Sequence, residues 1–201
     1  GAVEDLIQND LPVVLFDRYL PHLDTDYVIV DNYRGAYEAS RHFLDQDFKK
    51  IAFVTLESTQ TQMTDRLQGY LDALAEEKMA SLVKVIPAWK EEQSAIDDFS
   101  DFYDQHKPDA IFFSANHIAI IGLKAFQQKK APWPGIISFD DHTFFRLSNP
   151  TITVVSQPIS QIAEEVIQIL INKLAGKVKN RQKIVLPTQL IVRQSSLKQT
   201  S

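Results

Sequence analysis

The chain has 201 residues, and its 21 basic and 26 acidic residues give a formal net charge of −5. A surface that grips nucleic-acid phosphates carries a basic excess, so this charge argues against such a surface within the chain itself. The absence of cysteine excludes disulfides, thiol nucleophiles and cysteine zinc sites. No apolar run approaches the roughly 18–20 residues of a membrane span, and the first ten residues lack a signal-peptide pattern, so we expect a soluble protein.

Short apolar segments rich in β-branched and aromatic residues alternate along the chain with longer amphipathic segments. The short segments predict strands over 11–16, 27–30, 50–55, 82–87, 109–113, 135–139, 151–156 and 183–193. The longer ones predict helices over 33–46, 64–77, 93–106, 116–129 and 159–174. Most of the strand segments are apolar throughout, which is typical of strands buried on both faces of a parallel sheet. The pattern therefore predicts a doubly wound α/β fold with helices on both sides of the sheet.

Eight short segments form a recognisable series in chain order. They are PVVLFDR (12–18), VDNYRGA (30–36), KIAF (50–53), DRLQGY (65–70), PDAIF (108–112), ISFDD (137–141), TVVSQP (153–158) and LPTQLIVRQS (186–195). Any one of them alone is a weak signal. Together they resemble the effector-binding core of the LacI/GalR family of bacterial transcription regulators, which is itself similar to the type I periplasmic sugar-binding proteins.

The resemblance implies a fold of two α/β subdomains that are joined by three chain crossings and hold a small ligand in the cleft between them. By motif order, residues 1–30 and 158–176 are expected in the first subdomain, and residues 31–157 and 177–201 in the second. The crossings are then expected near 30–31, 156–157 and 176–181. Family members begin with a helix-turn-helix head, a hinge and two further βα units, so the chain is expected to be a family core truncated at its N-terminal side.

Arg66 lies one turn into the helix expected over 64–77. A positive charge near a helix start opposes the helix dipole, so stability alone does not favour arginine there. Its planar guanidinium can instead hold two vicinal hydroxyls or a carboxylate through paired hydrogen bonds. The alternative is a solvent-facing arginine paired with Asp65 or Asp72. The resemblance favours the first interpretation, because the arginine of the family's R-L-x-G-aromatic motif contacts the effector.

Asp140 follows the strand expected over 135–139, at the carboxyl end where open α/β sheets bind ligands. A carboxylate there can accept hydrogen bonds from two sugar hydroxyls. The alternative is that Asp140 or Asp141 caps the following turn. Because the resemblance gives the effector contact to the first aspartate of F-D-D, we expect Asp140 to bind the ligand and Asp141 to be structural.

Asn116 and Trp89 follow two other expected strands. Asn116 is expected to cap the helix over 116–129 while its amide faces the same rim. The family commonly has Asn-Asp at this place, and the change to Asn116-His117 can alter the choice of ligand. Trp89 offers an indole face on which a sugar ring or a base can stack. The family has an effector-stacking aromatic at about this point, and the alternative is an indole packed over its own helix.

Asp17, at the end of a strand, and Gln157, at a crossing, complete the expected rim, and Gln62 and Gln60 add amides from the loop before Arg66. Carboxylates, amides, one arginine and one tryptophan suit a neutral sugar or polyol better than a phosphate ester, with a purine base as second choice. No cofactor is expected. No metal is expected either, because the three consecutive residues 140–142 (DDH) rarely converge on one ion.

Phe144 and Phe145 lie in a segment after the F-D-D motif that is expected to be a loop, and adjacent phenylalanines in a surface loop suggest a contact with a partner. The family's dimer contact includes this region and the helix that carries Ile120, Ile121 and Leu123. The resemblance therefore implies a homodimer through Phe144, Phe145, Ile120 and Leu123. The alternative is that one phenylalanine anchors the loop in the core.

No nucleophile elbow, zinc-protease motif or glycine-rich phosphate loop is present, and the five histidines lie singly. An enzyme such as a sugar kinase or hydrolase therefore has no positive support. The resemblance implies the sensing core of a cytoplasmic regulator, in which the effector shifts the DNA affinity of a head outside this chain. A free-standing sugar-binding protein of a transporter is the alternative, and the segments 138–141 (SFDD) and 190–195 (LIVRQS) favour the regulator.

Overall fold

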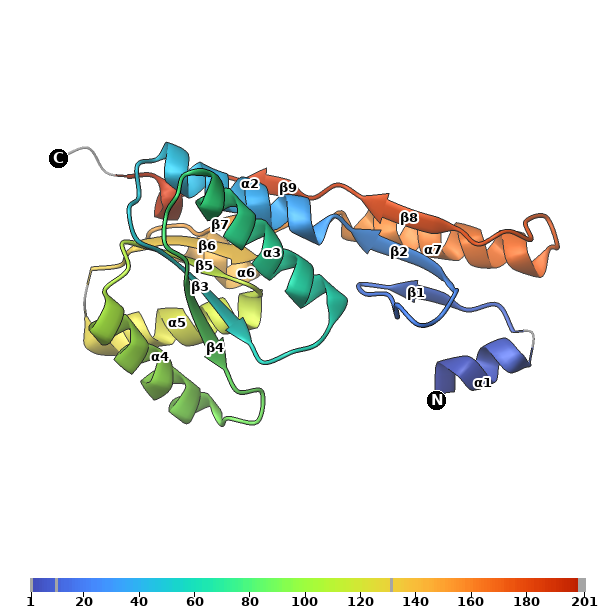
Figure 1. Ribbon diagram of the computed structural model, residues 1–201, viewed down its shortest axis with the longest axis horizontal. Helices are drawn as coiled ribbons and strands as arrows, with labels where there is room; N and C mark the ends of the chain where they lie inside the picture. Colours follow the sequence, from blue (N-terminus) through green and yellow to red (C-terminus); the bar gives the residue numbers. More distant parts are fainter. Residues whose placement is uncertain (1, 10, 131, 199–201) are drawn as a thin grey trace.

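The computed structural model describes residues 2–9, 11–130 and 132–198, and its elements follow one another as an alternation of strands and helices (Figure 1). Over these ranges the elements are α1 (Ala2–Gln8), β1 (Val14–Phe16), β2 (Asp26–Val30), α2 (Asn32–Asp45), β3 (Ile51–Leu56), α3 (Thr61–Glu76), β4 (Leu82–Ile86), α4 (Glu92–His106), β5 (Ala110–Phe113), α5 (Asn116–Lys129), β6 (Gly135–Phe139), α6 (Thr143–Leu147), β7 (Thr153–Ser156), α7 (Ile159–Leu174), β8 (Lys183–Leu186), β9 (Gln189–Ile191) and the 3-10 turn η1 (Gln194–Ser196).

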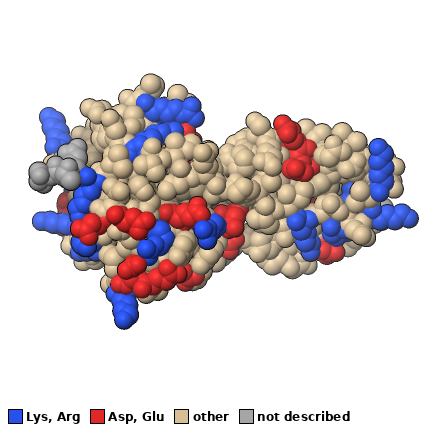
Figure 2. All heavy atoms as spheres, turned by 90° about the horizontal axis from the view of Figure 1, so that it is seen from above, with Lys and Arg blue, Asp and Glu red and all other residues tan. Residues whose placement is uncertain are grey.

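The strands of these ranges form two sheets, in the orders β1-β2-β8 and β4-β3-β5-β6-β7-β9. All neighbours are parallel except β7 and β9, which are antiparallel. The predicted α/β class with parallel sheets is confirmed. Each sheet belongs to its own lobe: the smaller lobe, with β1, β2, β8 and α7, lies at one end of the molecule in Figure 1, and a constriction separates the lobes in Figure 2.

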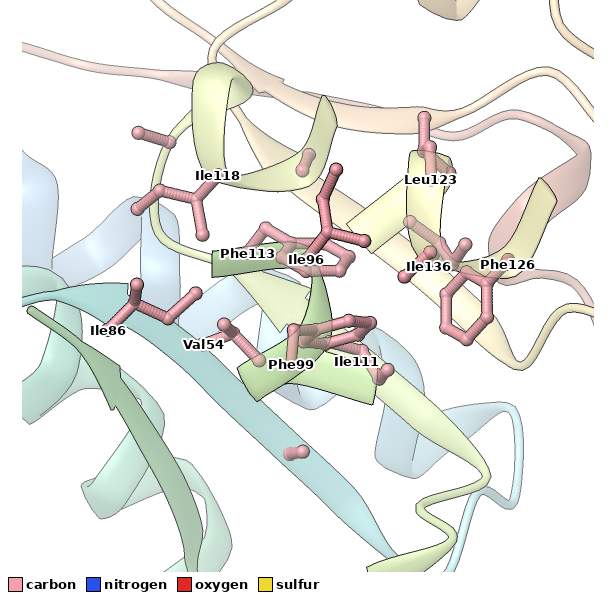
Figure 3. Close-up of a cluster of buried hydrophobic side chains, with 14 of the residues drawn as sticks. Val54, Ile86, Ile96, Phe99, Ile111, Phe113, Ile118, Leu123, Phe126 and Ile136 are labelled. Carbon is pink, nitrogen blue, oxygen red and sulfur yellow. The ribbon is translucent and has the colours of Figure 1, made fainter. Parts of the chain in front are cut away.

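The larger lobe has helices on both faces of its sheet, as its apolar strands require. The central strands β3, β5 and β6 are buried on both faces. On one face α2 and α3 cover an aromatic cluster that includes Phe43, Phe53 and Tyr70. On the other face α4 and α5 pack against the sheet through Phe99, Phe126 and their neighbours, as Figure 3 shows. The sheet is thus fixed from both sides, so the loops at its carboxyl edge start from rigid strand ends.

The smaller lobe has a small core in which Ile162 and Ile169 of α7 pack against the sheet. Other apolar side chains of α7 remain exposed, among them Ile167 at 56% and Leu174 at 73%. Phe16, on the edge strand β1, is also 62% exposed. The smaller lobe therefore presents an apolar face over β1 and α7.

The expectation of a single strand over 183–193 is wrong, because two strands in different sheets occupy this segment. β8 pairs with β2 in the smaller lobe, whereas β9 pairs antiparallel with β7 in the larger one. Pro187 lies between them, and proline lacks the N–H that a continuous ladder would need. The third crossing thus lies after Leu186, and the expected boundary that put 177–186 in the second subdomain is also wrong. The other two crossings lie where β2 leads into α2 and where β7 leads into α7.

Candidate functional site

Arg66 is buried, with only 3% of its surface exposed, and it ties together elements that are distant in sequence. Its Nε donates to Asn32 Oδ1 at the start of α2 (2.8 Å), and its Nη1 donates to the Ser114 carbonyl after β5 (2.7 Å). The guanidinium also lies 3.6 Å from the centre of the Phe139 ring at the end of β6. The alternative of a solvent-facing arginine is therefore wrong.

The guanidinium of Arg66 lies next to the carboxylate of Asp140. Its Nη1 lies 3.6 Å from Asp140 Oδ2, and Asp140 is partly exposed. Burial lowers the pKa of the Arg66 guanidinium, while the negative charges of Asp140 and Asp17 act in the opposite direction. Arginine nevertheless stays protonated in proteins because its unperturbed pKa is so high. The site thus contains a fixed cation beside a carboxylate that a ligand can reach.

Asp17 and Asp140 share an unusual backbone conformation. Both directly follow a strand, and both have a positive φ, of 70° and 68°. Aspartate tolerates this left-handed region better than most residues, but the conformation is strained, and strained residues cluster at functional sites. Asp140 Oδ1 accepts a hydrogen bond from Gln157 Nε2, and Asp17 Oδ2 accepts one from Gln62 Nε2 (3.0 Å). The turn after each strand therefore brings a carboxylate together with an amide.

Gln62, in the first turn of α3, connects the two lobes. Its Nε2 donates to Asp17 Oδ2 and to Gln60 Oε1 (3.2 Å), and because both partners are acceptors, the orientation of the amide is fixed. Gln62 is only 6% exposed, and within the described ranges its Oε1 has no hydrogen-bond partner. A buried acceptor without a donor lowers the stability of the fold by about 1–3 kcal/mol. A ligand that donates a hydrogen bond to Gln62 Oε1 would remove this penalty.

A cavity of about 770 Å³ lies against Asp140 and joins several expected site residues. Asn116 and Gln157 also line it. The expectation that the Asn116 side chain caps α5 is wrong: the N-cap is Ala115, with no side-chain bond, and Asn116 Nδ2 instead donates to the Asp141 carbonyl (3.3 Å). The amide is turned toward the loop after β6, which places it on the cavity wall.

Trp89 lies in the loop between β4 and α4 and is 78% exposed. The alternative of an indole packed over its own helix is therefore wrong. Trp89 is outside the set of described residues that line the cavity at Asp140. The structure leaves its indole free at the edge of the larger lobe without joining it to Arg66 and Asp140.

Asp141 lines the same cavity as Asp140, and its carboxylate accepts hydrogen bonds from two arginines. Arg193 Nη1 and Nη2 donate to its two oxygens (3.0 and 2.8 Å), and Arg146 donates to Oδ2. These hydrogen bonds, that of Arg193 first among them, lower the pKa of Asp141 to about 2 against the opposing effect of burial. Sequence reasoning missed Arg193 as well as Asn32, the partner of Arg66. Both stand in segments that carry the family resemblance, but nothing in the sequence says what they touch.

We expect Asp141 to make the unfolding free energy depend on acid pH. Because its pKa is lower in the folded chain than the ordinary 3.8, its contribution is complete above that value and is lost as pH falls toward about 2. The loss amounts to about 2 kcal/mol, from the size of this shift. Denaturant unfolding between pH 5 and 2 should show a shallower decline for Asp141→Asn than for the parent. Equal slopes would contradict the role of this ion pair.

The structure divides the residues expected at a dimer contact. Phe145 is fully buried and Leu123 is 4% exposed, so neither can provide much contact surface. The prediction of Phe145 as an interface residue is wrong, because α6 turns its side chain into the core. The segment that was expected to be a loop forms the short helix α6. Phe144 is 49% exposed beside a groove of about 710 Å³, which Ile120, partly buried, also lines.

Within residues 2–9, 11–130 and 132–198, no group of three or more histidine, cysteine, aspartate or glutamate residues is placed to hold a metal ion. Among the same residues, no helix is both long enough and apolar enough to cross a membrane.

Two lobes, three crossings and a polar cleft define a ligand-binding core, and residues 40–196 match the family model described as a periplasmic binding protein-like domain. The chain belongs to this family. Its similarity to LacI-family regulators confirms the predicted resemblance. The HTH-type transcriptional regulator DegA of Bacillus subtilis (strain 168) is 28% identical over 200 residues, which are 98% of this chain and 59% of DegA.

A second relative, the ribose operon repressor of Haemophilus influenzae, is 26% identical over 92% of this chain and 57% of its own length. Among solved structures, the complex of the transcriptional regulator CelR with cellobiose has a TM-score of 0.84 at 25% identity, over 94% of this chain and 60% of CelR. The chain thus spans about three-fifths of the length of these relatives.

Proposed function

We propose that this chain is the effector-sensing part of a cytoplasmic LacI-type transcription regulator, and that its effector is a sugar or polyol. The ligand binds between the lobes, and DNA is bound by a helix-turn-helix head outside the residues of this chain. The observation that carries the proposal is the buried Arg66 beside the accessible carboxylate of Asp140, at the carboxyl edge of the sheet. The proposed effector-binding residues are Arg66, Asp140, Asn116, Gln157, Asp17, Gln62 and Trp89.

The hydrogen-bonding groups of the cleft favour a ligand rich in donors. Arg66 already donates to Asn32 and Ser114, whereas no described residue donates to Gln62 Oε1. Asp17 and Asp140 add carboxylate oxygens, and carboxylates are acceptors only when ionised. Hydroxyl groups of a neutral sugar can donate to all three side chains. A phosphate ester would bring further acceptors and negative charge, so we propose an uncharged effector.

The relatives support this assignment. CelR was solved with cellobiose, and another relative is named as a ribose operon repressor. In this chain two hydrogen bonds join α3 of the larger lobe to the smaller lobe: Gln62 donates to Asp17, and Thr61 Oγ1 donates to the Tyr19 carbonyl. A ligand that replaces the Gln62–Asp17 bond changes how the two lobes are arranged. The difference between the ligand's affinities for the two arrangements sets how far it shifts their populations.

Titration of neutral sugars against the complete protein tests the assignment. We expect at least one of cellobiose, ribose, glucose and trehalose to give saturable heat in calorimetry. Asp140→Ala should weaken that binding at least tenfold, because it removes about 1.4 kcal/mol or more of charge-assisted hydrogen bonding. Asp104→Ala, which removes an exposed carboxylate from α4, is the matched control. An Asp140→Ala variant that binds as tightly as the parent would show that the site is elsewhere.

We propose a homodimer through the face around Phe144 and Ile120. Phe144 is 49% and Leu147 79% exposed on one short helix, and exposed apolar groups of this kind mark contact surfaces. In analytical ultracentrifugation, Phe144→Asp should shift the complete protein toward the monomer without changing its circular dichroism. A variant that stays as dimeric as the parent would place the contact on another face.

We propose no enzymatic role, because DegA, the ribose operon repressor and CelR are all named as regulators or repressors. The alternative is a sugar-binding protein of a transporter on the same fold. DNA binding of the complete protein that changes on addition of the sugar distinguishes the two.

A further inference from the structure

Arg193 follows β9 and is the main hydrogen-bond partner of Asp141. Its side chain is about as buried as that of Asp141. Besides the paired bonds to Asp141, its Nη1 donates to the Ile152 carbonyl (2.8 Å), and its backbone N–H donates to Thr153 Oγ1 (2.7 Å). The guanidinium is thus anchored to the segment that leads into β7.

The carboxylate that Arg193 holds belongs to the residue next to Asp140. Asp140 has a φ of 68°, and its own N–H donates to the Val155 carbonyl of β7 (2.9 Å). Asp141 is the second fixed point of this turn, because both of its carboxylate oxygens accept hydrogen bonds from Arg193. A left-handed aspartate persists only where its surroundings determine it.

We propose that Arg193 is a positioning residue for the effector, which holds Asp141 so that the Asp140 carboxylate points into the cleft. This inference rests on the proposed function. Arg193 itself does not touch the ligand; it acts through the peptide that joins Asp140 to Asp141. Arg146 shares the Asp141 carboxylate, but its side chain is 66% exposed and cannot fix the turn equally well.

A merely structural ion pair would stabilise the fold without affecting binding, and a double-mutant cycle separates the two roles. The sugar that binds the parent best in the panel of cellobiose, ribose, glucose and trehalose is titrated well below the melting temperature of every variant. Arg193→Met should weaken its binding about tenfold, which corresponds to about 1.4 kcal/mol. Arg193→Lys should recover part of the loss, since lysine keeps the charge but not the paired geometry. In an Asp140→Asn background, Arg193→Met should weaken binding by less than about threefold.

Arg181→Met is the matched control, because Arg181 pairs with the buried Asp26 of the smaller lobe. It should lower stability and leave sugar affinity unchanged. The proposal is overturned if Arg193→Met binds the sugar as tightly as the parent, or if its loss is equally large in the Asp140→Asn background. A parent protein that binds no sugar of the panel overturns the proposed function itself, and this inference with it.

Discussion

Arg66→Met is expected to abolish sugar binding and to lower the unfolding free energy by about 3 kcal/mol. Methionine fills much of the same space but leaves Asn32 Oδ1 and the Ser114 carbonyl without their donor. Asn32 is 3% exposed, so water cannot easily replace the guanidinium. Asp140 loses its neighbouring cation at the same time. Stability and binding fall together because the same group serves both.

Chemical unfolding and sugar titration of the variant check this expectation. Arg34→Met is the control on the exposed face of α2, where Arg34 pairs with Glu38 one turn further on. Exposed pairs of this kind contribute about 0.3–0.5 kcal/mol. If Arg66→Met proves no more destabilising than Arg34→Met, the buried hydrogen bonds of Arg66 do not have the strength assigned to them.

Gly69→Ala is expected to destabilise the larger lobe by about 3 kcal/mol, although alanine favours a helix more than glycine does. A Cβ at this position of α3 would lie 2.3 Å from the Tyr33 carbonyl oxygen and 2.9 Å from the Tyr37 nitrogen. Both are backbone atoms of α2, so only a shift of the whole helix relieves the overlap. Such a shift would also move Asn32, the partner of Arg66 at the start of α2.

Thermal unfolding tests the packing of α2 against α3. At about 2–4 °C per kcal/mol for a chain of this size, the melting temperature should fall by about 10 °C. Gln68→Ala, at the exposed neighbouring position, should change stability by less than about 0.5 kcal/mol. A Gly69→Ala protein as stable as the parent would mean that α2 and α3 lie further apart than the structure places them.

These two residues explain physically why the segment 65–70 (DRLQGY) carries so much of the family resemblance. Gly69 lets two helices approach closely on one face of the sheet, and Arg66 reaches from the same helix to the loops at the sheet edge. Packing and ligand recognition are thus combined in one turn of α3. A substitution at either position should therefore affect both.

The sequence by itself determined the order of most elements, since apolar segments buried on both faces of a parallel sheet differ clearly from amphipathic helices. The predicted α5 and α7 agree with the structure at both ends. It also determined that Arg66 and Asp140 are candidates, through the resemblance and their places at a helix start and a strand end.

Only the tertiary structure decided what those side chains touch. The partners of Arg66 lie 34 and 48 residues away, and Arg193 grips Asp141 from 52 residues away. The same limit explains the errors at 183–193 and at Phe145. Periodicity shows that a segment is apolar, but the sheet it joins and the direction its side chains face depend on distant strands and helices that complete the packing.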